Sequence, residues 1–307
     1  MNRKWQHTKS NIMSRSLLCA LLSAVLLHSL AAELAAAANT MANTKTENAG
    51  ANRKFSTEDV EASIKRAMTF LAGKEGSGGP QYSDYVVFCG LSISRSYPEY
   101  EGIVEPYKMW IAKHDLFSAK LPYQSICHVM ALDMSGNREQ ALEIFSQLKP
   151  LANEGAWLIP YHIGWYLYGC LVAGDTELGE KTFDHLMEMV ENRPEKFQYF
   201  TAYCVWKAYE KSHDERYRKA FLTIANNLRR FQGEYVQMAE TDGHMGMVLA
   251  VFCRAFDLTH DEEYRAMARD LAGKLLSTQA ANGSWNDKTA YTIMPAEGLF
   301  LYLTLCP

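Results

Sequence analysis

A recurrence of about 40 residues constrains the fold of this chain more strongly than any other feature of its sequence. Six segments open with a polar turn, continue with acidic residues and then become amphipathic. They begin near Ser56, Tyr97, Asn137, Asp175, Asp214 and Asp261. A repeat of this length has room for two helices and two turns, so the pattern predicts an array of helical hairpins.

The six segments have the pattern of helices that lie at a surface. The polar residue of each turn can cap the free amide groups of a helix, and the acids after it complement the positive end of the helix dipole. After Asp261, apolar residues recur at three- and four-residue spacing, at Tyr264, Met267, Ala268, Leu271 and Leu275. This spacing predicts one buried stripe, as expected for an outer helix.

Between these segments lie others that are apolar on most faces, which is typical of buried helices. They cover residues 85–96, 123–134, 161–173, 199–211, 244–258 and 291–305, and the stretch Tyr235–Met238 is the one strand-like exception. The alternation predicts an all-α fold, an α/α toroid of about six hairpins, or twelve helices, with an outer ring around an inner ring. An open solenoid is the alternative, but it would end in polar capping helices. Because the last segment is apolar, we expect it to pack against the first hairpin.

The start of the chain has the order of features found in secretory signal peptides. Basic residues at Arg3, Lys4, Lys9 and Arg15 precede an apolar run over 17–27 and four alanines at 35–38. The run is shorter than the roughly 20 residues of a membrane helix. We therefore predict a signal peptide over 1–38, a flexible leader over 39–55 and the toroid domain over 56–307. The protein is expected to be periplasmic or secreted, with no stable membrane span after cleavage.

Charge and cysteine content restrict the possible partners. The chain has 31 basic and 35 acidic residues, and the predicted signal peptide is basic, so the remainder is acidic. An acidic domain without a basic cluster argues against a nucleic-acid partner. Six cysteines follow the predicted cleavage site, none of them in a CxxC pair: Cys89, Cys127, Cys170, Cys204, Cys253 and Cys306. Their even number permits disulfides in an exported protein, but their apolar surroundings favour buried thiols.

Two segments share a spaced pattern. Arg66–Leu71 is followed by Glu75, Gly79 and Gln81, and Leu275 is followed by Gln279, Gly283 and Trp285. Both resemble the QW repeat of squalene-hopene cyclases and related prenyltransferase-like toroids. In that family the Gln and Trp join a helix end to the next turn. The resemblance covers short parts of two hairpins and implies a toroidal fold with a structural role for these residues.

The resemblance does not extend to the chemistry of those families. The chain has no DxDD-type acid motif of the cyclases and no Gly-Cys-Gly-Glu-Gln thioester core, and Asp84 stands at the wrong offset from Cys89 for the zinc ligands of protein prenyltransferases. We expect neither a metal nor another cofactor. Similar rings with a Gln-x-x-x-Gly-x-Trp turn occur among carbohydrate-active lyases, hydrolases and sugar epimerases. Export favours this class, by analogy, because polysaccharide is a common large substrate outside the cytoplasm.

In a ring of hairpins, the turns that lead into the inner helices meet at one end of the central cavity. Helix N-termini gathered there favour negative charge, and aromatic rings beside polar groups suit sugars. The candidate substrate-binding residues at this end are Tyr82, Tyr123, Tyr161, Trp165, Tyr203 and Trp285. The candidate catalytic residues are Asp84, Asp242, His162, His244 and Glu240.

These residues favour a carbohydrate-active enzyme for a polysaccharide or oligosaccharide, a glycoside hydrolase before a polysaccharide lyase. A hydrolase would use Asp84 and Asp242 as its two carboxylates, with Glu240 in reserve. A lyase would need a cation for the substrate carboxylate, for which Lys288 is the candidate. Its base would be one of three residues, Tyr161, His162 or His244. The alternative is a non-catalytic toroid of the terpenoid cyclase-like fold that binds a ligand or partner; a terpenoid-type cyclase would lack its acid.

Each candidate also has a structural interpretation. Asp84 and Asp242 can be helix caps. His128, next to Cys127, can be a core histidine bonded to a carbonyl rather than a metal ligand. Trp285 can belong to the QW-like turn.

Overall fold

The computed structural model describes residues 55–77, 80–114, 117, 122–152, 160–192, 198–231 and 244–306. The chain divides into two units, Met1–Lys54 and Phe55–Pro307, and every described residue belongs to the second. The predicted signal peptide, the predicted leader up to Lys54 and the strand-like stretch Tyr235–Met238 lie outside the described residues.

The described part of the chain is all-helical, as the sequence predicts, and contains no β-strand. Six α-helices correspond to the amphipathic segments: α2 (Thr57–Leu71), α4 (Glu101–Ala112), α6 (Arg138–Ala152), α8 (Thr176–Asn192), α10 (Glu215–Leu228) and α13 (Glu262–Thr278). Six correspond to the apolar segments: α3 (Pro80–Ser94), α5 (Pro122–Met134), α7 (Pro160–Ala173), α9 (Gln198–Ser212), α12 (Met245–Thr259) and α14 (Thr289–Leu305). Two short 3₁₀ helices, Pro98–Tyr100 and Arg229–Phe231, flank α4 and α10.

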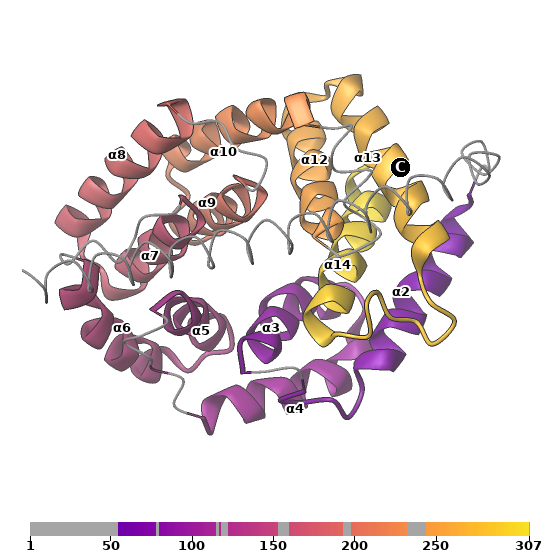
Figure 1. Cartoon of the computed structure of the whole chain (residues 1–307), viewed down its shortest axis with the longest axis horizontal. Helices are drawn as coiled ribbons and strands as arrows, with labels where there is room; N and C mark the ends of the chain where they lie inside the picture. Colours follow the sequence, from indigo (N-terminus) through magenta and orange to yellow (C-terminus); the bar gives the residue numbers. More distant parts are fainter. Residues whose placement is uncertain are drawn as a thin grey trace, which may run out of the picture. The chain divides into compact units, whose positions relative to one another are not determined.

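The apolar helices lie inside the amphipathic ones (Figure 1). Each inner helix contacts the next, in the order α3, α5, α7, α9, α12 and α14, and α14 then contacts α3. Each of the first five inner helices packs against the outer helix that follows it in the chain, whereas α14 packs against α2. The first outer helix therefore partners the last inner helix, and the contacts between inner helices return to their starting point.

The turns that open the outer helices explain the recurrence in the sequence. In four of them a residue with positive φ precedes the cap: Gly136 (92°), Gly174 (68°), His213 (55°) and His260 (55°). The next residue immediately precedes the outer helix. Asp214 and Asp261 accept hydrogen bonds from backbone amides of the first turn. The left-handed residue ends the inner helix and the polar cap starts the outer one, so each short turn reverses the chain.

A QW-like turn after α13 joins the last outer helix to the first. The Gln279 amide donates to the carbonyls of Ser63 at 2.9 Å and Gly283 at 3.0 Å, and its Oε1 accepts from the Ser63 hydroxyl at 2.9 Å. The Arg66 guanidinium donates to the same oxygen at 2.6 Å. The bonds from Gln279 to Ser63 and Arg66 connect positions more than 200 residues apart, since Ser63 and Arg66 belong to α2.

Trp285 has a structural place in the same turn. Its indole N–H donates to the Leu275 carbonyl at 3.1 Å, and the ring is 3% exposed. Gly283 has φ of 89°, and a Cβ atom there would lie 2.3 Å from the Arg66 carbonyl oxygen. A residue without a side chain is therefore needed where the turn meets α2. These contacts give Gln279 and Trp285 a structural role in this turn.

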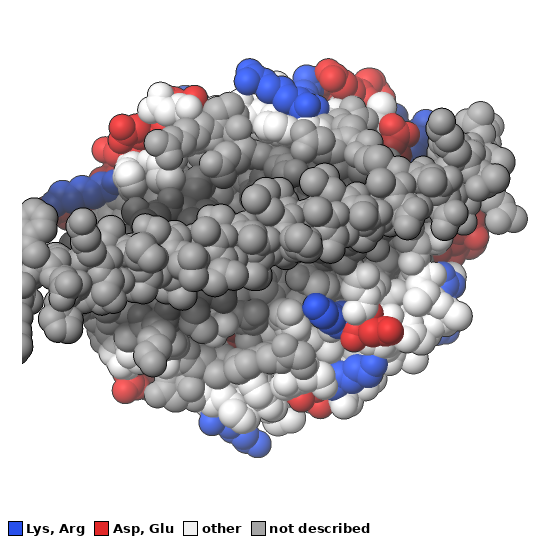
Figure 2. Space-filling model, in the orientation of Figure 1, with Lys and Arg blue, Asp and Glu red and all other residues white. Residues whose placement is uncertain are grey.

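The outer helices carry exposed charged side chains. Figure 2 shows Lys and Arg interspersed with Asp and Glu around the margin of the visible described surface. Within the described ranges, no helix combines the length and the apolar character needed to cross a membrane.

Candidate functional site

Rings from four inner-helix N-terminal regions meet in one cluster, which we call the aromatic rim: Tyr82, Tyr85, Phe200, His244 and Tyr291. Tyr291 lies 6.1 Å from Tyr82 and 5.3 Å from His244, between ring centroids. Phe200 lies 5.1 Å from His244 and 6.2 Å from Tyr85. All five side chains are half-buried. Residues from α3, α9 and α14 and the cap of α12 thus share one rim, although they are distant in sequence.

A second layer of rings is buried beside the rim. Trp165 of α7 packs 6.0 Å from Tyr85 and 5.4 Å from Phe88, and Tyr203 packs 5.6 Å from Phe88. The Tyr199 hydroxyl and His244 Nδ1 are hydrogen-bonded at 2.8 Å. Trp165 and Tyr203, two predicted substrate-binding residues, belong to this buried layer. Trp165 contacts the rim at Tyr85, and Tyr203 contacts Phe88, which in turn contacts Tyr85, whereas Tyr82 is part of the rim itself.

Asp84 and His128 form a buried pair between α3 and α5. His128 Nδ1 donates to Asp84 Oδ1 at 2.8 Å, and both side chains are 0% exposed. Among the described residues, the second oxygen of Asp84 and Nε2 of His128 have no hydrogen-bond partner. Burial raises the pKa of the Asp84 carboxyl, while the charge of His128 and its hydrogen bond act in the opposite direction.

The pair corrects two structural interpretations from the sequence. Asp84 lies one turn inside α3 and is not a cap, because its carboxylate accepts from a side chain of the neighbouring helix. His128 is bonded to a carboxylate rather than to a carbonyl. A carboxylate at Nδ1 fixes the ring and leaves Nε2 as the atom that can take or give a proton. The pair therefore has the arrangement of an oriented acid–base histidine.

The other sequence candidates are only partly described. Glu240 and Asp242 lie outside the described residues, so the predicted carboxylate pair with Asp84 is not placed. Tyr123 and Tyr161 lie in the first turns of α5 and α7, but their side chains are outside the description. His162 of α7 is 9% exposed, and burial lowers its pKa to about 4.

A second buried polar cluster was not expected from the sequence. Arg254 of α12 and Glu297 of α14 form an ion pair at 3.3 Å, and the Tyr203 hydroxyl donates to the same Glu297 oxygen at 3.3 Å. Arg254 is 3% exposed and Glu297 is 0% exposed. The available signal was a charged residue in the middle of each of two apolar helices, which is a rare position for Arg or Glu unless it is paired.

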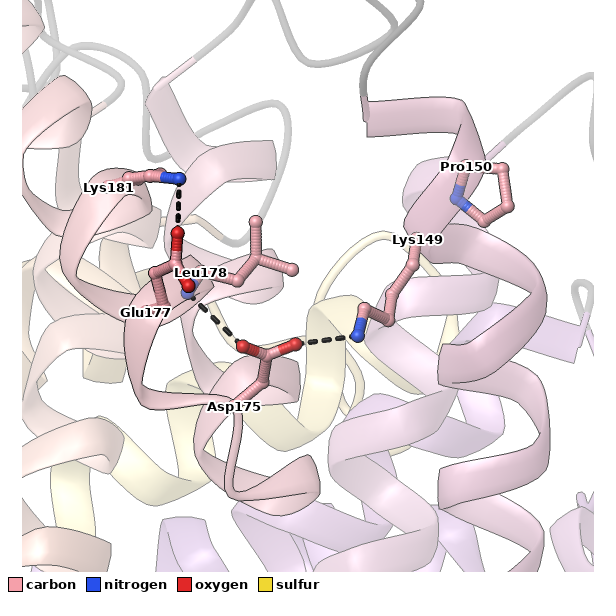
Figure 3. Close-up of a pocket in the computed structure, with 6 residues that line it drawn as sticks. All are labelled: Lys149, Pro150, Asp175, Glu177, Leu178 and Lys181. Atoms are coloured by element: carbon pink, nitrogen blue, oxygen red, sulfur yellow. Dashed lines mark hydrogen bonds and ion pairs between the residues drawn. The ribbon is translucent and has the colours of Figure 1, made fainter.

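The open pocket in Figure 3 lies away from these groups, between α6 and α8. Its volume is about 470 Å³, and it is lined by Lys149, Pro150, Asp175, Glu177, Leu178 and Lys181. The lysines and acids pair with one another: Lys149 with Asp175 at 2.6 Å and Lys181 with Glu177 at 2.7 Å. Asp175 also accepts from the Leu178 amide at 3.2 Å. These charges are satisfied by the outer helices themselves, so the pocket is not a catalytic candidate.

No group of three or more His, Cys, Asp and Glu side chains suited to a metal ion occurs in the described part. Comparison with protein-family models, with curated proteins and with solved structures found no match. The candidate site therefore has to be judged from its own geometry.

Proposed function

We propose that this protein is an exported carbohydrate-active enzyme of the α/α-toroid class, with Asp84 and His128 as its acid–base pair. The observation that carries the proposal is the buried hydrogen bond from His128 to Asp84, with His128 Nε2 bonded to no other residue in the part of the chain that the structure describes. The return of the inner-helix contacts from α14 to α3 supports the toroid assignment.

The aromatic rim supports a sugar as the ligand. Sugar rings expose C–H faces that stack on aromatic side chains, while their hydroxyls need polar partners. The rim supplies both: Tyr82, Tyr85 and Tyr291 carry rings with hydroxyls, and His244 adds a ring nitrogen.

The pair favours proton transfer by a histidine over a two-carboxylate hydrolysis, which reverses the order expected from the sequence. In a uronate-type elimination, a base removes the proton beside the sugar carboxylate, a C=C bond forms, and the glycosidic oxygen leaves and takes up a proton. His128 Nε2 would take the first proton and pass it to the leaving oxygen, and Asp84 would stabilise the intervening imidazolium through Nδ1. Because Asp84 Oδ2 and His128 Nε2 are buried, substrate binding must displace the side chains that cover them.

Lys288 supports an acidic sugar. It is the N-cap residue of α14, its side chain makes no capping bond, and its Nζ lies 5.1 Å from the centroid of Tyr291. A cation at the rim can pair with a uronate carboxylate.

The test is turnover on a panel of neutral glucans and uronate-containing polysaccharides. Elimination is followed by the absorbance of the unsaturated product, and hydrolysis by new reducing ends. We expect elimination from a uronate polymer, and we expect Asp84→Asn and His128→Gln to reduce kcat by about 100-fold or more at a similar Tm. His185→Gln, on the exposed side of α8, is the matched control and should keep wild-type turnover.

Three outcomes separate the alternatives. If the protein hydrolyses its substrate without elimination, and His128→Gln does not change the rate, the two-carboxylate mechanism with Asp84 and Asp242 is favoured instead. Binding of an oligosaccharide without turnover would favour the non-catalytic ligand-binding toroid. Equal turnover by the wild type and both variants would exclude the pair as the catalytic group.

A further inference from the structure

The QW-like turn contains an Asn-Gly step, Asn282-Gly283, which is the only one in the sequence. Asn282 is exposed, whereas Gly283 and Ser284 are buried. In such a step the glycine nitrogen can attack the side-chain amide carbon of the asparagine, because glycine has no Cβ to hinder the approach. This reaction, deamidation, proceeds without an enzyme. The folded geometry around the two reacting atoms therefore decides how fast it occurs.

The turn holds both polar atoms of the Asn282 side chain. Nδ2 donates to Asp287 Oδ1 at 2.8 Å, and Oδ1 accepts from the Ser284 backbone amide at 3.0 Å. The Ser284 hydroxyl lies 2.8 Å from the same Asn282 oxygen and 2.8 Å from Asp287 Oδ1. Rotation of the amide carbon toward the Gly283 nitrogen therefore requires these bonds to break.

The attacking nitrogen is restrained as well. The Gly283 N–H donates to the Ala280 carbonyl at 2.9 Å, and the Ala280 N–H donates to the Ser284 carbonyl at 3.0 Å. The nitrogen must lose its proton before it can attack, and this bond holds the proton in place. Gly283 also packs so closely on the Arg66 carbonyl that an added Cβ would lie 2.3 Å from its oxygen, which leaves the backbone little room to rotate. The closed turn thus restrains both reacting groups.

We propose that Asn282 is a deamidation site that the closed turn protects, and that its conversion loosens the contact between the turn and α2. In the reaction, the Gly283 nitrogen loses its proton to hydroxide and bonds to Asn282 Cγ. The side-chain nitrogen takes a proton from water and leaves as ammonia. One water molecule then opens the succinimide ring at either carbonyl, which gives aspartate or isoaspartate. The net reaction consumes one water and releases one ammonia.

Neither product can restore the bonds of the turn. A carboxylate formed from Asn282 cannot donate to Asp287, so two acceptors would face each other. The hydrogen bond from Asn282 lowers the pKa of the Asp287 carboxyl, which is therefore charged at neutral pH, and two like charges at this distance repel. Isoaspartate adds one carbon to the backbone before Gly283. This shifts Gly283 from its contact with Arg66 and strains the bond that its carbonyl accepts from Gln279.

The experiment is incubation of the full chain at mildly alkaline pH, in buffer and in urea, followed by peptide mapping for the aspartate and isoaspartate products. A synthetic peptide of residues 278–288 gives the unprotected rate under both conditions. In urea, Asn282 should react at the rate of the peptide. In the folded chain it should react at least about tenfold more slowly, because the hydrogen bonds of the turn must break first.

Asp287→Ala tests the hydrogen bond that holds the amide. It removes the acceptor of Asn282 Nδ2 and should raise the folded rate by about tenfold. Asn286→Ala is the matched control. Asn286 has φ of 58° and Asp287 has φ of 51°, so both variants place an alanine in left-handed backbone, but the control keeps the acceptor. Its folded rate should stay close to that of the wild type.

Urea unfolding gives a second measurement. The deamidated chain, separated by ion exchange, should unfold at a lower urea concentration than the unreacted chain. Asn282→Asp supplies the aspartate product directly and should shift the midpoint in the same direction. A folded rate equal to that of the peptide would overturn the proposed protection, and an unchanged midpoint would overturn the proposed loosening. Neither result bears on carbohydrate turnover.

Discussion

Gly283→Ala tests whether the last outer helix is joined to the first. Gly283 lies in the QW-like turn with φ of 89°, and an added Cβ would meet the carbonyl carbon of Arg66 at 2.6 Å and its oxygen at 2.3 Å. These atoms are backbone atoms of α2, so they cannot move aside as the end of a flexible side chain can. Either α2 or the turn must shift.

The cost has two main parts, the backbone conformation and the steric contact. A non-glycine residue in the left-handed region costs roughly 1–2 kcal/mol. Crowding a well-packed contact typically costs a further 1–3 kcal/mol. The shift would also strain the Gln279 bonds to Ser63 and Gly283, each of which contributes about 1 kcal/mol. We therefore expect Gly283→Ala to lower the free energy of unfolding by about 2–5 kcal/mol.

Gly174→Ala is the matched control. Gly174 has φ of 68° but nothing lies within 4 Å of an added Cβ, so this variant should show the backbone cost alone, roughly 1–2 kcal/mol. Urea unfolding gives both values, provided that the slope with denaturant stays constant. Equal losses in the two variants would mean that the turn does not contact α2 as described, and would refute the connection between the chain's first and last outer helices.

Three further predictions concern the buried charges and the rim. Glu297→Gln leaves the Arg254 charge buried without its carboxylate and should lower the free energy of unfolding in urea by about 3–5 kcal/mol. The double variant with Arg254→Met should recover much of that loss. If the losses of the two single variants simply add in the double variant, the pairing is contradicted. Burial lowers the pKa of His162 from 6.5 to about 4, so the folded state favours the neutral ring; the stability it contributes is complete above pH 6.5 and declines as the pH falls toward 4. In urea unfolding between pH 6.5 and 4, His162→Phe should reduce the decline in the free energy of unfolding, whereas the exposed-site variant His185→Gln should leave it unchanged. The same dependence on pH in both variants would contradict the attribution to His162. Lys288→Met should lower kcat/KM on a uronate polymer by about tenfold and leave turnover of a neutral glucan unchanged. Equal losses on both substrates would exclude a specific contact between Lys288 and the uronate carboxylate.

Much of the helical layout could be predicted from the sequence. The apolar segment predicted over 123–134 corresponds to Pro122–Met134, and the start predicted at Asp261 is the cap of Glu262–Thr278. These features depend on spacing and caps within a few residues, so they are visible in one segment at a time.

The candidate site was predicted less completely. Tyr82 and His244 lie in the rim as the hairpin argument expects, and Asp84 lies in a buried polar pair. Its partner, His128, was noticed in the sequence but interpreted as a core residue. The partner of a buried carboxylate depends on which faces of two helices meet, and spacing within one helix does not determine this.

By itself, the sequence determined the alternation of amphipathic and apolar helices and the turns between them, because helix periodicity and capping act over a few residues. The tertiary structure decided which distant side chains pair: Asp84 with His128, Arg254 with Glu297, and Gln279 with Ser63. Such pairs depend on the crossing and rotation of packed helices. A local pattern places a residue on the buried face of its helix but does not specify which residue faces it.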